Sequence, residues 1–165
     1  LAGLPSEALP AIPRDIMWSA TLAMLSRAVI RLGAVAYAPP IYELLAPHAE
    51  RDCVWGSGLM TFGPISRYLG MLATTLGEPD LALSHLEHAF ERCLSLGSPS
   101  LAARTKREMA RALQVRRRDG DVARMRTLLE EAGQSAAELG MPGLADTTRR
   151  MLAEIGVHAS EAAVS

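Results

Sequence analysis

The fold is decided by residues 69–89, LGMLATTLGEPDLALSHLEHA. Apolar residues recur every three or four positions on each side of Gly77, which is the spacing of an amphipathic helix. Glycine takes the left-handed conformation that ends a helix at little cost, and Pro79 suits the first turn of the helix that follows. The stretch therefore predicts two helices that form a hairpin with its turn at Gly77.

The same turn signal recurs along the chain at a regular interval. Gly33, Gly77 and Gly120 lie 44 and 43 residues apart, and Gly97 and Gly140 are also separated by 43. Helix stops at such an interval are typical of repeating helical hairpins. No alternating run of β-branched residues bounded by a hairpin turn is found, so we expect an all-α fold without strands. The expected helices cover 15–32, 35–49, 64–76, 79–96, 99–118, 121–139 and 142–155.

The second helix of each hairpin carries a common pattern of side-chain sizes. Five, nine and twelve residues after the turn glycine, the residues are usually small, large and small, as close packing of antiparallel helices requires. They are Ala38, Tyr42 and Leu45, then Ala82, Leu86 and Ala89, then Met125, Leu129 and Ala132. Gly70 interrupts a helix at a cost of about 1 kcal/mol relative to Ala, so we expect a second helix to approach it closely.

This pattern resembles the tetratricopeptide-type repeat, in which small, large and small residues follow the turn glycine at these offsets. The middle hairpin matches best, whereas the first departs at Pro39 and Pro40 and the third has Met125 at a small position. The resemblance implies antiparallel helical hairpins, three of them plus a final helix, stacked as a right-handed solenoid.

A narrower resemblance covers nearly the whole chain. The segments GPISRYLGMLATTLG (63–77), YELLAP (42–47) and AART (102–105) are similar to the C-terminal repeat region of large bacterial signalling ATPases. That group includes adenylate cyclase-like proteins and LuxR-type transcriptional regulators. The resemblance implies an output or cyclase module and a nucleotide-switch module in the parent protein, but these residues contain no GxxxxGKS or GxxxxGKT phosphate loop.

The amino-acid composition excludes several classes of protein. Seventeen basic and eighteen acidic residues leave a net charge of −1, which excludes binding of nucleic acid by net charge alone. An apolar content of 49% excludes disorder over most of the length, and no run of eighteen apolar residues predicts a membrane span. We expect an extended segment at 1–14, the repeat domain at 15–156 and a flexible tail at 157–165.

Three features of the sequence bear on its cellular setting. The chain starts at Leu1 and not at Met, which predicts a piece of a longer protein. No secretory signal is found, and two cysteines are too few for a disulfide framework or a zinc ribbon. A reducing, cytoplasmic location is therefore expected.

No pattern predicts catalysis or a cofactor, so we expect that the chain is not an enzyme. His85 and His88 share a helix face near Glu87 and Glu91, but zinc needs three or four ligands in a closed geometry. A histidine pair on the surface of a packed helix is the favoured interpretation. The loop at 50–63 is too apolar for a solvated linker, and we favour one that folds back over the core of the first hairpin. The alternative is a partner-docking patch built on Trp55, a residue type common in binding hot spots.

Arginine dominates residues 104–126, a segment that contains nine basic and three acidic residues. Arg104, Arg107 and Arg111 recur at i, i+3 and i+7 and so form one stripe on a helix. A solvated helix face is favoured. If the stripe binds a partner, an acidic protein surface comes ahead of nucleic acid, because no aromatic platform accompanies the arginines.

The tetratricopeptide resemblance implies that the first helix of each hairpin lines a concave groove. The side chains expected in that groove are Trp18, Arg67, Arg104, Arg107 and Arg111. Arginine pairs bidentately with carboxylates, so we expect the groove to take an acidic segment, from another protein or from the parent itself. The function predicted is an interaction or sensing scaffold in a bacterial signalling or transcriptional regulator. The alternatives are a non-catalytic region of an adenylate cyclase-like enzyme and a nucleic-acid-binding helical repeat. The sequence leaves open whether the chain forms a homo-oligomer.

Overall fold

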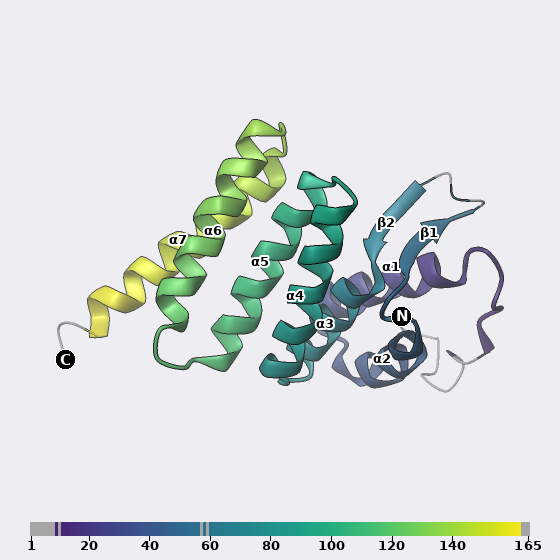
Figure 1. Ribbon diagram of the computed structural model, residues 1–165. Coiled ribbons are helices and arrows are strands. Elements are labelled where there is room, and N and C mark those ends of the chain that lie inside the picture. Colours follow the sequence, from purple (N-terminus) through teal and green to yellow (C-terminus); the bar gives the residue numbers. More distant parts are fainter. Residues whose placement is uncertain (1–8, 10, 57, 59, 163–165) are drawn as a thin grey trace. The chain divides into compact units, whose positions relative to one another are not determined.

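The structure, a computed structural model, describes residues 9, 11–56, 58 and 60–162. This part of the chain is mostly helical, as the sequence predicts, with one small two-stranded sheet (Figure 1). The α-helices are α1 (Trp18–Leu32), α2 (Ala38–Leu45), α3 (Ile65–Thr75), α4 (Pro79–Ser95), α5 (Pro99–Arg116), α6 (Asp121–Glu138) and α7 (Pro142–Ala162). Two short 3-10 helices, η2 (Val35–Tyr37) and η3 (Ala46–His48), flank α2. Each expected helix is therefore found.

The segment between α2 and α3 forms a β-hairpin, so the prediction of no strands is wrong. β1 (Asp52–Trp55) pairs antiparallel with β2 (Met60–Pro64). The hydroxyl of Tyr68, in α3, donates a hydrogen bond to the carbonyl of Phe62 at 2.9 Å. The hairpin is thus tied to the helix that follows it.

Three local features of the hairpin bear on why it escapes the pattern analysis. A bulge between Cys53 and Val54 shifts the register, which breaks the alternation of side chains that marks a strand in a sequence. The reversal uses Gly56 and Gly58, whose φ angles of 60° and 88° favour glycine. The strands are also very short, so the apolar run resembles a loop.

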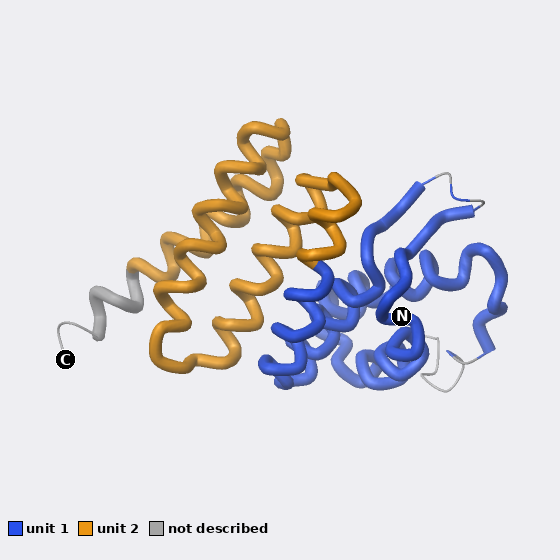
Figure 2. Tube along the Cα trace, viewed as in Figure 1, with its two compact units in different colours: residues 1–89 blue, residues 90–165 orange. Residues whose placement is uncertain are grey.

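The chain divides into two compact units, residues 1–89 and 90–165, and the boundary falls inside α4 (Figure 2). The expected repeat domain at 15–156 extends over both units.

The two expected terminal segments lie partly outside the described residues. Of the segment at 1–14, residues 1–8 and 10 lie outside, whereas Leu9 is buried in the core of the first unit. Of the tail at 157–165, residues 163–165 lie outside, and α7 continues to Ala162, later than the pattern predicts.

The core of the first unit is formed by α1, α2, α3 and the base of the β-hairpin. Leu22, Leu45 and Leu69 are among its fully buried side chains. Cys53 in β1 belongs to the same core and has no exposed surface, whereas Trp55 at the far end of the strand is 37% exposed. The hairpin base therefore covers this core while its outer end is open to solvent.

Gly70 lies at a close contact between α3 and α4, which confirms the prediction for this residue. A Cβ atom at this position would lie 2.5 Å from Cγ of Leu86 and 3.0 Å from the carbonyl oxygen of Ala82. Ala82, Leu86 and Ala89 are fully buried, as the small–large–small pattern predicts. The absence of a side chain at position 70 is what lets Leu86 pack directly against α3.

The second unit contains α5, α6 and α7, and α6 packs against both of the others. Leu113 on α5 and Leu129 and Ala132 on α6 are fully buried. Met125, which stands at a small position of the pattern, is also buried, at 5% exposure. The flexible thioether side chain fills the space that a smaller residue would leave there.

Candidate functional site

Two of the predicted arginines line a cavity at the turn between α6 and α7. Arg104 and Arg107 lie three residues apart on α5 and therefore share a face of that helix. The cavity has a volume of about 360 Å³, and its other walls are Gly140, Met141, Pro142, Gly143 and Leu144. Ala103, Ala136 and Leu144 form a small buried cluster that joins the three helices beside it.

The turn that closes this cavity is set by its glycine and proline. Gly140 has a φ of 63°, which ends α6, and Pro142 begins α7 without needing a hydrogen-bond acceptor for its nitrogen. The carbonyl of Met141 accepts hydrogen bonds from the N–H groups of Leu144 and Ala145, both at 3.1 Å. The first residues of α7 thus form one wall, and the positive end of the helix dipole lies there.

The charges at the cavity are predominantly positive. Arg107 forms an ion pair with the neighbouring Glu108, and Arg111 also lies 3.6 Å from that carboxylate. The Nε of Arg107 is buried and has no hydrogen-bond partner among the described residues. Arg104 is exposed, and the described residues that line the cavity include no carboxylate. The cavity can therefore receive an anionic group between two guanidinium groups and a helix N-terminus.

The other predicted groove residues do not join this cavity. Arg111 is exposed one turn further along α5 and contributes to the pairing of Glu108. Trp18 is only 8% exposed because its ring packs edge-on against His48, with a centroid distance of 5.2 Å. Arg67 is 6% exposed, and its guanidinium lies 5.6 Å from the ring centroid of Tyr68. Trp18 and Arg67 therefore offer little exposed surface to a partner.

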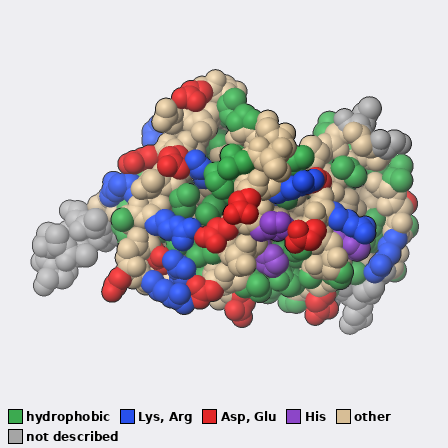
Figure 3. Space-filling view, in the orientation of Figure 1, with side chains coloured by type: hydrophobic (Ala, Val, Ile, Leu, Met, Phe, Trp, Pro, Cys, Tyr) green, Lys and Arg blue, Asp and Glu red, His purple; other side chains and the backbone are tan. Residues whose placement is uncertain are grey.

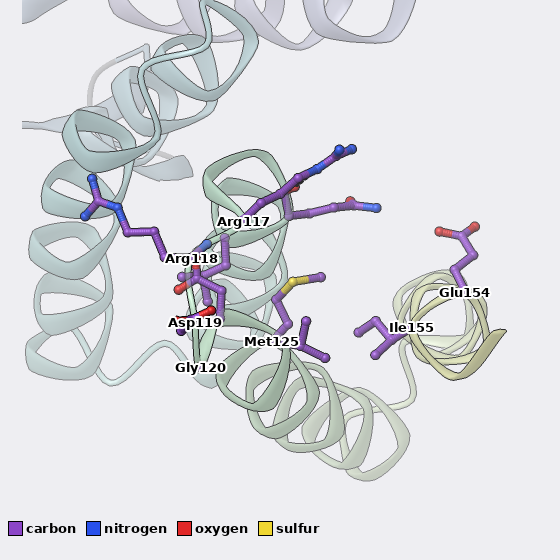
Figure 4. Close-up of a pocket in the computed structure, with 11 residues that line it drawn as sticks. Arg117, Arg118, Asp119, Gly120, Met125, Glu154 and Ile155 are labelled. Carbon is purple, nitrogen blue, oxygen red and sulfur yellow. Dashed lines mark hydrogen bonds between the residues drawn. The ribbon is translucent and has the colours of Figure 1, made fainter. Parts of the chain in front are cut away.

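A second and larger cavity in the same unit was not foreseen from the sequence. It has a volume of about 630 Å³ and lies between the α5–α6 turn and the later part of α7 (Figure 4). Met125 from α6 and Ile155 from α7 project into the gap between the helices. Polar residues stand at its edges, with Arg117 and Arg118 at the α5–α6 turn and Glu154 on α7. Lys and Arg side chains gather around this end of the unit in Figure 3.

An ion pair holds the α5–α6 turn beside this second cavity. Arg116 donates hydrogen bonds to both carboxylate oxygens of Asp121, at 3.0 Å and 2.6 Å, and the backbone N–H of Arg118 donates to the same carboxylate at 2.8 Å. Asp121 is 3% exposed. The bonds from Arg116, with that from Arg118, lower the pKa of Asp121 to about 2. An aspartate in the first turn of a helix, five residues after an arginine, is the sequence signal that points to this clamp.

The two histidines of α4 make separate contacts within the first unit. Nε2 of His85 lies 2.8 Å from the hydroxyl of Tyr42, and Nε2 of His88 lies 3.2 Å from a carboxylate oxygen of Glu50. Burial, with the neighbouring His88, lowers the pKa of His85. Within the described ranges, no three His, Cys, Asp or Glu side chains are grouped so that they could hold a metal ion.

The outer end of the β-hairpin presents apolar side chains to solvent. Trp55 packs edge-on against Phe62 with a centroid distance of 6.0 Å, and Val54 and Met60 are 38% and 56% exposed. Trp55 is therefore accessible, as a docking residue must be.

Comparisons with protein-family models, with curated protein sequences and with solved structures find no match for this chain. None of the helices within the described residues combines the length and the apolar character that a membrane span requires.

Proposed function

We propose that this chain is an interaction module of the tetratricopeptide type and that it binds an acidic protein segment at the cavity of Arg104 and Arg107. In this proposal the helical hairpins stack as a right-handed solenoid within a bacterial signalling or transcriptional regulator. The glycine-ended helices, the close contact at Gly70 and the buried small–large–small positions support the repeat. The segment comes from a partner protein or from another part of the parent.

One observation carries the choice of ligand: two arginines of α5 meet the first turn of α7 in a single cavity. A carboxylate there would accept charge-assisted hydrogen bonds from a guanidinium group, which are roughly twice as strong as neutral ones. The partly buried position of Arg107 reduces screening by solvent. Its Nε is buried and has no hydrogen-bond partner in the described part of the chain.

The test is a titration of a fluorescein-labelled, glutamate-rich peptide followed by fluorescence polarisation. A peptide with glutamine at each glutamate position serves as the ligand control. We expect the double variant Arg104→Gln/Arg107→Gln to weaken binding about tenfold or more, because it removes donors to a charged acceptor. Glutamine keeps much of the side-chain length and avoids placing a new carboxylate beside Glu108.

The matched control is Arg149→Gln/Arg150→Gln, which removes the same charge from two exposed arginines of α7 that do not line the cavity. Its affinity for the acidic peptide should stay close to that of the unaltered chain. Equal losses in the two double variants would mean that the peptide responds to overall charge, and the site would be rejected. Far-UV circular dichroism verifies that each variant is folded.

A further inference from the structure

The β-hairpin of the first unit exposes apolar side chains on one of its faces. Trp55 and Met60 are partners in the strand register, and Phe62 follows Met60 by two residues, so the three side chains share that face. The edge-on contact between Trp55 and Phe62 agrees with this arrangement. Trp55 is 37% exposed, Met60 is 56% exposed and Phe62 is partly buried. These three residues form the hairpin face, and an exposed tryptophan among apolar neighbours is typical of a binding hot spot.

Side-chain hydrogen bonds fix the hairpin and also occupy backbone groups of β2. The hydroxyl of Thr61 donates to the carbonyl of Cys53 at 3.2 Å and accepts from the N–H of Gly63 at 3.0 Å. The carbonyl of Phe62 accepts the hydrogen bond from Tyr68. A strand added to the edge of β2 would need such backbone groups to be free. We therefore expect a partner to pack on the hairpin face and not to extend the sheet.

Positive charge from α1 lies beside the hairpin. Arg27 is exposed and makes no ion pair with any residue that the structure describes. Burial raises the pKa of Tyr68, and the nearby charges of Arg67 and Arg27 oppose that shift. Since the hydroxyl of Tyr68 is bonded to β2, Arg27 lies near the junction of α1, α3 and β2. Arg31 is also exposed and follows Arg27 by one turn of α1.

The acidic residues of this region share a different cavity with other arginines. α1, α3 and β2 contain no Asp or Glu, and β1 contains only Asp52. Asp52 and Asp15 line a cavity of about 370 Å³. Arg14 and Arg51 line the same cavity, so its two anions are balanced by two cations. The two arginines of α1 are left to pair with a partner.

We propose that the hairpin face and the two arginines of α1 together bind an acidic amphipathic helix of a partner protein. Apolar side chains of that helix pack against Trp55 and Phe62, and two of its carboxylates pair with Arg27 and Arg31. A helix fits because the arginines are four residues apart, a spacing that carboxylates at i and i+4 of a second helix match. This surface shares no residue with the cavity of the second unit that takes the acidic segment, so the two proposals stand or fall separately.

The test is fluorescence polarisation with a fluorescein-labelled helical peptide that carries leucines along one face and glutamates at i and i+4 beside it. The peptide is titrated with the Arg104→Gln/Arg107→Gln chain, which removes binding at the other cavity. This chain should bind the peptide, and a further Trp55→Ala change should weaken binding by roughly tenfold or more. With unlabelled peptide, the tryptophan emission should shift to shorter wavelength, and the shift reports Trp55 because Trp18 is already buried.

The charged contacts are tested by Arg27→Gln/Arg31→Gln in the same background. This change should weaken binding by about threefold to tenfold, because exposed ion pairs contribute modestly to affinity. It should also remove most of the dependence of the affinity on salt, since salt screens such pairs. A peptide with glutamine at each glutamate position should bind both chains equally.

Two matched controls lie in the second unit. Leu94→Ala shortens an apolar side chain that is 59% exposed, and Arg149→Gln/Arg150→Gln removes two exposed arginines. Neither should change the affinity, and far-UV circular dichroism verifies the fold of each variant. Absence of binding overturns the proposal, as does equal affinity of the Trp55→Ala chain. Self-association through Trp55 in sedimentation equilibrium, or binding to phosphatidylserine vesicles in place of the peptide, overturns it too, because the occupant is then a second copy or a lipid surface.

Discussion

Replacing Gly70 with alanine sets two opposing effects against each other. In an open helix, the change from glycine to alanine stabilises by about 1 kcal/mol because it removes backbone freedom from the unfolded chain. At position 70 the added Cβ would lie 2.5 Å from Cγ of Leu86, 2.9 Å from its Cδ2 and 3.0 Å from the carbonyl oxygen of Ala82. Cγ is the branch point of that leucine and the carbonyl is backbone, so neither can yield without moving α4.

Overpacking of this kind costs about 1–3 kcal/mol, which exceeds the gain in helix propensity. We expect Gly70→Ala to lower the free energy of unfolding by about 1 kcal/mol and the melting temperature by roughly 2–4 °C. Gly156→Ala is the matched control, because a Cβ at this position of α7 has no heavy atom within 4 Å. It should have the opposite sign and stabilise by up to about 1 kcal/mol.

The assay is urea unfolding followed by far-UV circular dichroism, together with tryptophan fluorescence from Trp18 and Trp55 in the first unit. A double-mutant cycle identifies the contact responsible. Leu86→Ala alone should cost about 2–5 kcal/mol, and less in the Gly70→Ala background because the clash has been removed. The reasoning is refuted if Gly70→Ala stabilises as Gly156→Ala does, or if the effects of Gly70→Ala and Leu86→Ala simply add.

Two further predictions follow from titratable groups. The pKa of Asp121 is lowered from 3.8 to about 2, so its contribution, about 2 kcal/mol, is present above pH 4 and lost as the pH falls toward 2. Asp121→Asn should remove that part of the acid sensitivity of unfolding, measured by circular dichroism, whereas Asp119→Asn at the exposed neighbour should not. Burial raises the pKa of the Cys53 thiol to about 11, and Cys93 is also fully buried. Both thiols should react with an aromatic disulfide reagent only as fast as the protein opens, and a fast reaction of the native chain would show an exposed thiol.

The helices could be predicted because their determinants are local. Gly77 and Gly140 end helices through the backbone conformation of a single residue, and the apolar positions around them repeat within one or two turns. Gly70 is informative for the same reason: its cost within a helix implies a compensating contact, and Leu86 supplies it. The β-hairpin depends instead on a bulge at Cys53 and on pairing between strands, which a search for alternating residues does not detect.

Of the predicted groove residues, only Arg104 and Arg107 line one cavity, and the reason is related. The spacing of Arg104 and Arg107 places them on one helix face, but the wall that completes their cavity comes from the start of α7 and depends on tertiary packing. Arg67 shows the opposite case. An arginine has a long apolar stem, so a position off the apolar stripe can still be buried, with the guanidinium over the Tyr68 ring. Spacing in a sequence does not distinguish these outcomes.

The charged run before α6 shows why counting charges is a poor guide to where they act. Residues 116–121, RRRDGD, are typical of a solvated surface. In the folded chain the carboxylate of Asp121 accepts hydrogen bonds from Arg116 and from the backbone N–H of Arg118. These bonds neutralise one cation and fix the turn. Arg117 has a left-handed backbone, donates a hydrogen bond to the carbonyl of Gln114 and stands at the edge of an apolar cavity. One buried carboxylate therefore both rigidifies the turn and determines which arginine is left at the edge of the cavity.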